Sequence, residues 1–475
     1  MRARLLRTCS LVALATAAAC GSDPAPMTEL PPWDKELPDA RVIGTWRGLE
    51  PARGIVHLHS PYSHDACDNN PRDDLGAVNE PCLLDLRSAL CATRIDFAAL
   101  TDHDASMADE EFPTLFSMRG NDVAIMDAQA NQIGSRMTCD DGHVVTFSVG
   151  GENDLMPVML DRHPTAATLQ ERHDIYNAYD TAAVAAYRDA GGLAWVAHTE
   201  SKTVDDLKLL APDGIEVYNL HANIDPDIRK DYLGLDAGGA IAAAAEFADT
   251  NPGHPEPDLA MLAFLTPNQP AITTWNALLG AGLKLPATAG SDAHENAIPI
   301  VFADGERGDS YRRVLRWFDN IVMVADHSDP AQVEAALKAG RLFALFELLG
   351  TPEGLDIRAT NATRTFELGD TVPVADGAML TVNLPTVHAL DPTLPPPIVR
   401  ARVLWIETPT GVVTELASTD STVDTRLDVH IGAVGAYRVE IYITPRYLGP
   451  YLGDLGPDLA EAELPWIYAS PIYVQ

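Results

Sequence analysis

The sequence predicts an α/β protein, with a parallel α/β barrel over residues 50–352 and a C-terminal antiparallel β-sandwich domain over residues 353–475. Two observations lead to this prediction. In the first region, short apolar runs alternate with helical patterns, which is typical of strands joined by helical crossovers. In the second region, apolar and polar residues alternate with no helical stretch between them, which is typical of antiparallel sheets.

The first 19 residues predict a signal peptide. Arg2, Arg4 and Arg7 precede the run LVALATAAAC, which is too short to span a bilayer. The run ends at Cys20 and resembles a bacterial lipobox, in which the cysteine is lipidated and becomes the mature N-terminus. Ordinary cleavage with a free Cys20 is the alternative. Residues 20–49 then form a Pro-rich tether, and we expect an exported protein, lipid-anchored in the bacterial cell envelope at the outer membrane or facing the periplasm.

The overall charge is strongly negative. The chain has 33 Lys and Arg against 68 Asp and Glu, a formal net charge of −35. Such a surface repels a phosphate backbone, so nucleic acid is not expected as a partner. A net negative charge of this size can serve simply to keep a secreted protein soluble.

Four cysteines follow the predicted anchor, and an exported chain favours their oxidation. They can pair in three ways. We expect Cys67 to pair with Cys82 and Cys91 with Cys139, because the stretch DNNPRDDLGAVNEP between the first two has no apolar periodicity to order it. Four free, buried thiols are the alternative.

Seven apolar runs are the predicted strands of the barrel region: GIVHLH (54–59), IDFAALT (95–101), HVVTFSV (143–149), LAWVA (193–197), GIEVYN (214–219), LPATAG (285–290) and NIVMVA (320–325). Helices are predicted over 167–190, 271–282 and 330–340; the last has Pro near its start and Gly at its end. Residues 225–270 are interpreted as an insertion between two strands.

Histidines and carboxylates follow the carboxyl ends of several of these strands. The carboxyl ends of barrel strands converge on one face, where catalytic groups lie. We therefore expect these side chains to meet: His57 and His59 at the first strand, Asp102 and His103 at the second, His198 at the fourth, Asp292 and His294 at the sixth. His143 stands at the start of the third strand and breaks the pattern.

Imidazole and carboxylate ligands suit Zn, Mn or Fe. We expect two or three such ions, with metal-bound water supplying hydroxide near neutral pH and two ions holding both the attacking and the leaving oxygen of an ester. A single histidine at a strand end can equally be a polar cap, so the prediction depends on several motifs occurring together.

The motifs HLHSPYSHD, IDFAALTDHD, GHVV, VAHTES, GIEVYN and ATAGSDAH resemble, in order and setting, those of the polymerase-and-histidinol-phosphatase (PHP) superfamily. The C-terminal GAYRVEIYI and PWIYASPIYV, with the export signal, resemble the branch that includes carbaryl-hydrolase-like metallohydrolases. The resemblance implies a distorted (β/α)7 barrel and phosphoester hydrolysis at a two- or three-metal centre.

The resemblance also implies a ligand set. His57 and His59 would bind one ion with Asp292, and Asp65, or its neighbour His64, would be a further ligand. His103 and His294 would complete another ion, and His143 and His198 would hold a further one. The implied catalytic set is His57, His59, His103, Asp292 and His294. The residues implied to orient ligands or contact substrate are Asp102, His64, Gln132, Glu216 and Asn219.

The sequence departs from the family pattern at two positions. A bridging Glu is expected upstream of the GH motif, where the nearest equivalent is Gln132, and a neutral amide bridges two cations poorly. Asp140 or Asp141 is the alternative bridge. Ile55 stands where the family has an Asp.

The function predicted from these observations is an exported metal-dependent hydrolase, most simply a phosphoesterase acting on a small-molecule ester. Carboxylic ester or carbamate hydrolysis is the first alternative. A non-catalytic cell-surface binding lipoprotein with a degenerate metal site is the second. Nucleotide-binding fingerprints of the Walker or dinucleotide type are absent from the sequence.

Overall fold

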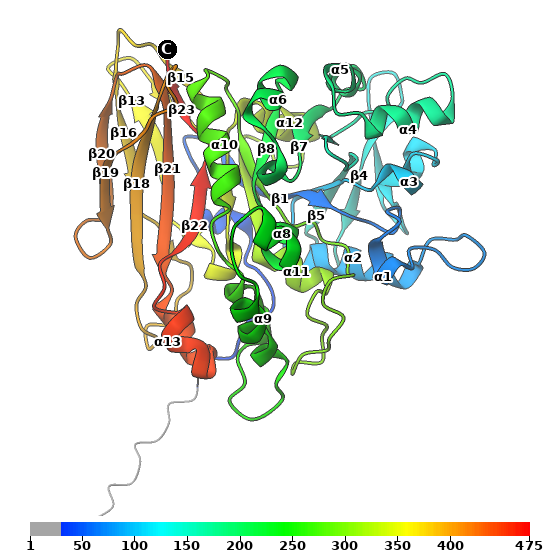
Figure 1. Ribbon diagram of the computed structural model, residues 1–475, viewed down its shortest axis with the longest axis horizontal. Helices are drawn as coiled ribbons and strands as arrows, with labels where there is room; N and C mark the ends of the chain where they lie inside the picture. The colour runs from blue at the N-terminus through cyan, green and yellow to red at the C-terminus, as the bar shows by residue number, and fades with distance from the viewer. Residues whose placement is uncertain (1–29) are drawn as a thin grey trace, which may run out of the picture. The chain divides into compact units, whose positions relative to one another are not determined.

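The computed structural model describes residues 30–475, so the predicted signal peptide and Cys20 lie outside the described residues. Trp33–Gln475 forms one compact unit of mixed α/β structure (Figure 1). Within the described part of the chain, no helix is both long enough and apolar enough to cross a membrane.

All seven predicted strands of the first region are present. Most of their residues are buried, because both faces of each strand are covered, which explains their nearly continuous apolar sequences. Their bounds are β1 (Glu50–Leu58), β2 (Phe97–Leu100), β5 (Val144–Val149), β7 (Leu193–Val196), β8 (Gly214–Asn219), β9 (Ala287–Gly290) and β10 (Asp319–Val324).

These strands belong to two hydrogen-bonded sheets, and their ladders do not show a closed barrel. β1, β2 and β5 are parallel neighbours in the larger sheet. β7, β8 and β9 are parallel neighbours in a four-stranded sheet that β6 (Met156–Val158) joins antiparallel. The prediction of seven parallel strands is wrong for β10, which runs antiparallel to β1. An apolar run shows that a strand is buried but does not show its direction.

The two sheets meet where β1 and β9 end. Leu58 forms a parallel bridge with Ala293. The backbone N–H of His59 donates to the Ala293 carbonyl at 3.0 Å, and that of Asp292 donates to the His57 carbonyl at 3.2 Å. These bonds bring the polar residues after β1 against those after β9, although the chain separates them by more than 230 residues.

The predicted helices are present with shifted ends. The span 167–190 contains two helices, α4 (Leu169–Asn177) and α5 (Thr181–Asp189), because Asp180 caps a new helix by accepting from the N–H groups of Ala182 and Ala183. The other two are α10 (Gln269–Gly280) and α12 (Pro330–Ala339). The predicted insertion carries α8 (Pro226–Asp231) and α9 (Gly238–Ala245).

Most strand pairs of the C-terminal region are antiparallel, and its sheets are seen side by side in Figure 1. The exception is β15 (Thr371–Val372), which pairs parallel with the last strand of the chain. One sheet contains β14 (Thr365–Phe366), β13 (Asp356–Thr360), β16 (Ala378–Asn383) and β20 (Arg426–Ile431). The strands β18 (Ile398–Glu407), β19 (Val413–Asp420), β21 (Gly435–Thr444), β22 (Leu464–Ala469) and β23 (Ile472–Val474) belong to the larger sheet. β22 pairs with β11 (Leu342–Leu345), so this sheet runs without a break across the predicted boundary at residue 353.

Both expected disulfides are present. Cys67 pairs with Cys82, with Cα atoms 6.1 Å apart, and Cys91 pairs with Cys139, at 5.8 Å. Cys67 lies in α1 (Ala66–Asn69), and its N–H donates to the His294 carbonyl at 2.9 Å. The first disulfide therefore fixes the segment that carries Asp65 to α2 (Glu80–Ala92).

We predict that Cys82→Ser lowers the free energy of unfolding by about 3 kcal/mol, because the bond closes a 15-residue loop in the unfolded chain. Chemical denaturation of the variant and of the wild type measures the difference. Peptide mapping without reduction must find both pairs in the wild type; free thiols at Cys67 and Cys82 would contradict the prediction.

Candidate metal centre

His57 and His59 present their Nε2 atoms to the same point at the end of β1. Both side chains are fully buried, and the two Nε2 atoms are 3.3 Å apart. His57 Nδ1–H donates to Glu216 Oε1 at 2.7 Å. The Ser63 hydroxyl donates to Asp65, so His59 Nδ1–H donates to Ser63 Oγ at 3.1 Å. These bonds leave the lone pair of each Nε2 free for a cation.

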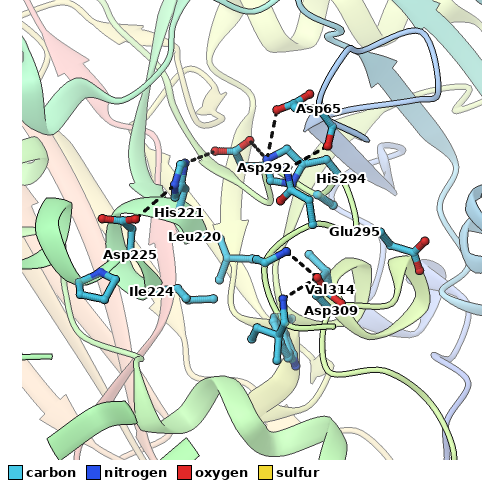
Figure 2. Close-up of a pocket in the computed structure, with 16 residues that line it drawn as sticks. Asp65, Leu220, His221, Ile224, Asp225, Asp292, His294, Glu295, Asp309 and Val314 are labelled. Atoms are coloured by element: carbon cyan, nitrogen blue, oxygen red, sulfur yellow. Dashed lines mark hydrogen bonds and ion pairs between the residues drawn. The ribbon is translucent and has the colours of Figure 1, made fainter. Parts of the chain in front are cut away.

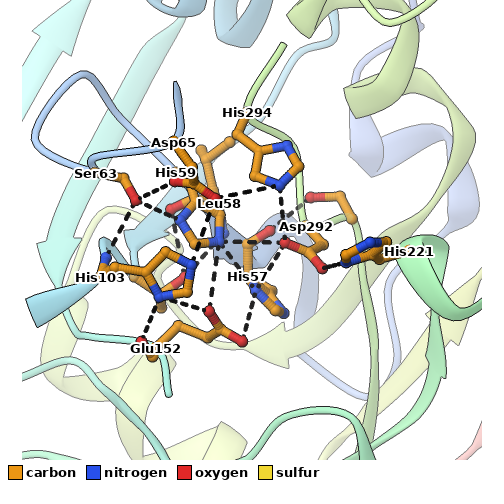
Figure 3. A network of polar contacts seen from close by, with 12 residues as sticks. His57, Leu58, His59, Ser63, Asp65, His103, Glu152, His221, Asp292 and His294 are labelled. Carbon is orange, nitrogen blue, oxygen red and sulfur yellow. Dashed lines mark hydrogen bonds and ion pairs between the residues drawn. The ribbon is translucent and has the colours of Figure 1, made fainter. Parts of the chain in front are cut away.

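Asp292 lies at the centre of the cluster (Figure 3). Its carboxylate oxygens lie 3.2–3.8 Å from ring nitrogens of five histidines: His57, His59, His198, His221 and His294. Oδ2 is buried and accepts no hydrogen bond. An unpaired buried carboxylate oxygen is costly, and a cation would satisfy it.

Glu152 is the second shared carboxylate. It follows the carboxyl end of β5, and its side chain is nearly fully buried. Oε1 lies 3.2 Å from His198 Nε2, and Oε2 lies 3.1 Å from His103 Nδ1. In addition, Oε1 lies 3.9 Å from His57 Nε2, and Oε2 lies 3.9 Å from His59 Nε2. Glu152 thus has the position of a bridge between histidine groups.

His103 and His294 approach from opposite sides toward Asp65. His103 Nδ1–H donates to the Glu152 carbonyl at 2.8 Å, and its Nε2 lies 3.5 Å from Asp65 Oδ2. His294 Nε2 lies 3.7 Å from the same oxygen. Asp65 closes the cluster on the side of the first disulfide.

Together these side chains offer three overlapping sets of ligand atoms, each within 4.8 Å of one another: His57–His59–Asp292, His59–His103–Glu152 and His198–His221–Asp292. Imidazole nitrogens with carboxylate oxygens suit borderline transition metals. A fourth set consists of three carboxylates, those of Asp258, Asp304 and Glu306, and lies outside the cluster. These carboxylates form ion pairs with Arg312 and Arg313. This set needs no ion.

The electrostatics of the cluster favour bound cations. Burial would raise the pKa of Glu152, but its hydrogen bond to His198 and the nearby imidazoles lower the pKa to about 2. Burial would lower the pKa of His103, but the hydrogen bond to Asp65 and the charge of Glu152 raise it to about 9. Burial lowers the pKa of His294 to about 4, which leaves a neutral ring with a free lone pair. The buried carboxylates remain ionised and require positive charge among them.

Residues around the cluster orient its ligands. Glu216 Oε2 accepts from the His198 N–H at 3.2 Å and from Asn219 Nδ2 at 3.1 Å, while Oε1 holds His57. A Cβ at Gly290 would lie 2.0 Å from Glu216 Oε1, so glycine permits this approach. Asp102 accepts from the N–H and the hydroxyl of Ser60, and burial raises the pKa of Asp102 to about 6. Glu216 thus contacts the predicted ligands His57 and His198 directly, whereas Asp102 contacts Ser60 in the segment after β1.

Several predicted residues are not in the cluster. His143 stands at the amino end of β5, where Nε2–H donates to the Ile95 carbonyl at 2.8 Å. Gln132 donates to the Gly134 carbonyl from β4 (Gln132–Thr138), and Asp140 and Asp141 are exposed near the second disulfide. The predicted roles of His143, of Gln132 and of the Asp alternatives are therefore corrected, because these residues precede β5 rather than follow it. His64 is exposed, with its ring 5.1 Å from that of His103.

Sequence reasoning missed Glu152 and His221. Glu152 follows β5 in the segment SVGGEND, and His221 follows β8 in the segment YNLHAN, within α7 (Leu220–Ile224). Both positions satisfy the strand-end rule that located the other ligands. Applying the rule after every strand, rather than at the recognised motifs, would have found them.

A cavity of about 350 Å³ adjoins the cluster (Figure 2). His221, Asp292 and His294 line its inner end. Its walls are largely apolar, formed by Leu220, Ile224, Pro226, Ala293, Ala297, Ile298, Val314 and Trp317. None of the described residues that line it is Lys or Arg.

No family model and no curated protein matches this chain. Among solved structures, it is similar to a two-domain protein containing a predicted PHP-like metal-dependent phosphoesterase, from Bacteroides vulgatus ATCC 8482. The TM-score is 0.36, with 12% identity, over 94% of this chain and 100% of that chain. It is also similar to PsfC from Pseudomonas syringae PB-5123, with a TM-score of 0.29 and 14% identity, over 58% of this chain and 82% of that chain. Both TM-scores are low, so the geometry of the site carries the functional argument.

We predict that Asp292→Asn and Glu152→Gln each lower the bound transition metal by at least one equivalent, because each removes a carboxylate shared by several histidines. Elemental analysis of purified protein measures the loss, and circular dichroism shows whether the variants fold. His143→Gln is the matched control and must leave the metal content unchanged. Equal metal content in the Asp292 variant and the wild type would contradict the assignment.

Proposed function

We propose that this chain is a metal-dependent hydrolase of the PHP superfamily that cleaves phosphoesters, with two or three Mn, Zn or Fe ions bound by the cluster. The main support is the arrangement of Asp292 and Glu152, two buried carboxylates that are each shared among several histidines. A structural ion pair does not need a carboxylate whose two oxygens lie within reach of three and two imidazoles.

The proposed ligands are His57, His59, Asp65, His103, Glu152, His198, His221, Asp292 and His294. Bound ions would activate water and neutralise the charge that develops on the ester oxygens. The protein fixes the ligands for this chemistry. Glu216 keeps the proton of His57 on Nδ1, Ser63 does the same for His59, and the Glu152 carbonyl does so for His103.

The cavity beside the cluster supports a restricted class of substrate. Two of its acidic side chains outside the metal cluster already have backbone partners: Asp309 accepts from the N–H groups of Ala297 and Ile298, and Asp225 caps α8. Glu295 and Asn296 add polar groups, and the rest of the wall outside the cluster is apolar, with no Lys or Arg among the described residues that line it. This lining suits an uncharged, apolar leaving group and disfavours a polyphosphate.

The same cavity favours carboxylic ester or carbamate hydrolysis as the second candidate function, because neither substrate needs a cationic phosphate clamp. Glu152 lies between His103 and His198 and would supply the bridging carboxylate that Gln132 lacks, which weakens the main argument for the binding-lipoprotein alternative.

We also propose that the protein is exported and anchored to the bacterial cell envelope through a lipid on Cys20. Two disulfides in the described residues support an oxidising compartment. Release of a Cys20→Ser variant from the membrane fraction tests the anchor; a wild type that is already free of membranes would contradict it.

We predict that the metal-depleted protein has no esterase activity and regains it when Mn, Zn or Fe is added. Separate assays with aryl phosphate, aryl carboxylate and aryl carbamate esters identify the bond that is cleaved. His57→Ala must abolish the recovered activity, because His57 belongs to the set shared with Asp292. Full activity in the presence of a strong chelator would contradict a metal-dependent mechanism.

We predict that Ile298→Ala lowers kcat/KM about tenfold for esters with a bulky apolar leaving group and little for a methyl ester, because part of the apolar wall is lost. Ile300→Ala is the matched control, since Ile300 is 54% exposed and does not line the cavity. An equal loss for both leaving groups would show that the cavity does not bind the leaving group.

A further inference from the structure

A second cavity, of about 620 Å³, lies between α10 and the strands β18 and β21. One wall is a single face of α10, on which Gln269, Thr273 and Asn276 recur at helical spacing. The opposite wall is one face of the sheet, with alternate residues of each strand: Arg402 and Leu404 of β18, and Arg438, Glu440 and Tyr442 of β21. It shares no lining residue with the candidate metal centre.

This cavity is cationic in a strongly acidic protein. Arg402, Arg438 and Lys208 line it, against the single carboxylate of Glu440. The two arginines and Tyr442 share that carboxylate: Arg402 Nε donates to Oε2 at 2.8 Å, the Tyr442 hydroxyl donates to Oε2 at 3.0 Å, and Arg438 Nη2 donates to Oε1. Outside the cavity, Glu415 lies 3.8 Å from Arg402 and the exposed Asp205 lies 3.8 Å from Lys208, so Arg438 is the lining cation whose charge is shared with Glu440 alone.

Arg438 has hydrogen-bonding capacity that the protein does not use. Its side chain is fully buried, and its guanidinium lies 4.2 Å from the centre of the Trp275 ring. Nε and Nη1 have no hydrogen-bond partner. A purely structural pair with Glu440 would leave these buried, charged donors unsatisfied, which is unfavourable.

A complementary acceptor lies on the opposite wall. Asn276 Oδ1 is buried and also lacks a hydrogen-bond partner. Gln269, Thr273 and Thr410 add further amide and hydroxyl groups, and Lys208 and Thr410 are exposed, so the cavity opens to solvent. The lining therefore offers charged donors at Arg438 and neutral polar groups along α10.

We propose that this cavity binds a hydroxylated organic anion of small-molecule size. Arg438 and Arg402 bind its carboxylate or phosphate group, and Asn276 accepts a hydrogen bond from one of its hydroxyls. The unused donors of Arg438 suit either anionic group, because charged N–H donors bind carboxylate and phosphate oxygens alike. This site goes beyond the proposed hydrolase activity and does not depend on it.

Isothermal titration calorimetry with glucuronate, glucose 6-phosphate and glucose tests the proposal on the full chain. We expect one-to-one binding of at least one of the two anions and none of glucose, and the anion that binds identifies the acidic group. Arg402→Gln weakens binding at least tenfold. Arg426→Gln is the matched control, because Arg426 is an exposed arginine of β20 outside the cavity, and it leaves the affinity unchanged.

Arg438→Lys keeps the charge but removes the unused guanidinium donors, and we expect it to abolish binding. If this buried variant does not fold, Arg402→Gln decides the question, since Arg402 is partly exposed. No heat with either anion up to about 10 mM, a concentration that detects even weak sites, overturns the proposal. So does equal binding of glucose, or an unchanged affinity in Arg402→Gln.

A second control separates this cavity from the metal centre. Chelator-treated protein and Asp292→Asn must bind the anion with unchanged affinity. Loss of binding in either sample would mean that the anion binds at the metal centre, and would overturn the assignment to the α10 cavity without affecting the proposed hydrolase function.

Discussion

The structure of the candidate centre depends on the burial of one carboxylate, that of Asp292, among five histidines. Its backbone has φ +48°, and that of His198 has φ +49°, in the left-handed region that costs a non-glycine residue roughly 1–3 kcal/mol. Asp292 stands two residues after β9, and His198 stands two residues after β7. The side chains of both residues point into the cluster. Two of the residues with this backbone conformation are thus ligands of the proposed ions.

The surrounding structure maintains this arrangement. The junction of β1 with the segment after β9 joins the two sheets next to His57, His59 and Asp292. Glu216 fixes the ring of His57, and Gly290 leaves the space that Glu216 needs. The Cys67–Cys82 disulfide and the Cys67 N–H bond to His294 hold the segment of Asp65 against the cluster. Secondary structure, covalent cross-links and hydrogen bonds therefore all constrain the same few ligand atoms.

Much of this arrangement could be predicted from the sequence, because polar residues after apolar strands are a strong local signal. His57, His59, His103, His198, Asp292 and His294 were located in this way, and the structure brings them together. The roles expected of His143 and Gln132 are wrong, because both residues precede β5 and so lie away from the carboxyl end of that strand. The antiparallel direction of β10 and the continuous sheet through β11 and β22 depend on pairing between distant segments, which local patterns do not encode.

The most direct test of the central claim is anomalous X-ray diffraction from crystals of the metal-loaded protein, recorded on both sides of the absorption edge of the bound metal. The account predicts anomalous peaks between the ring nitrogens of His57 and His59 and the carboxylate of Asp292, and between Glu152 and its neighbouring histidines. Peaks at His143 or Gln132, or no anomalous peak beside Asp292 in the presence of excess metal, would contradict it.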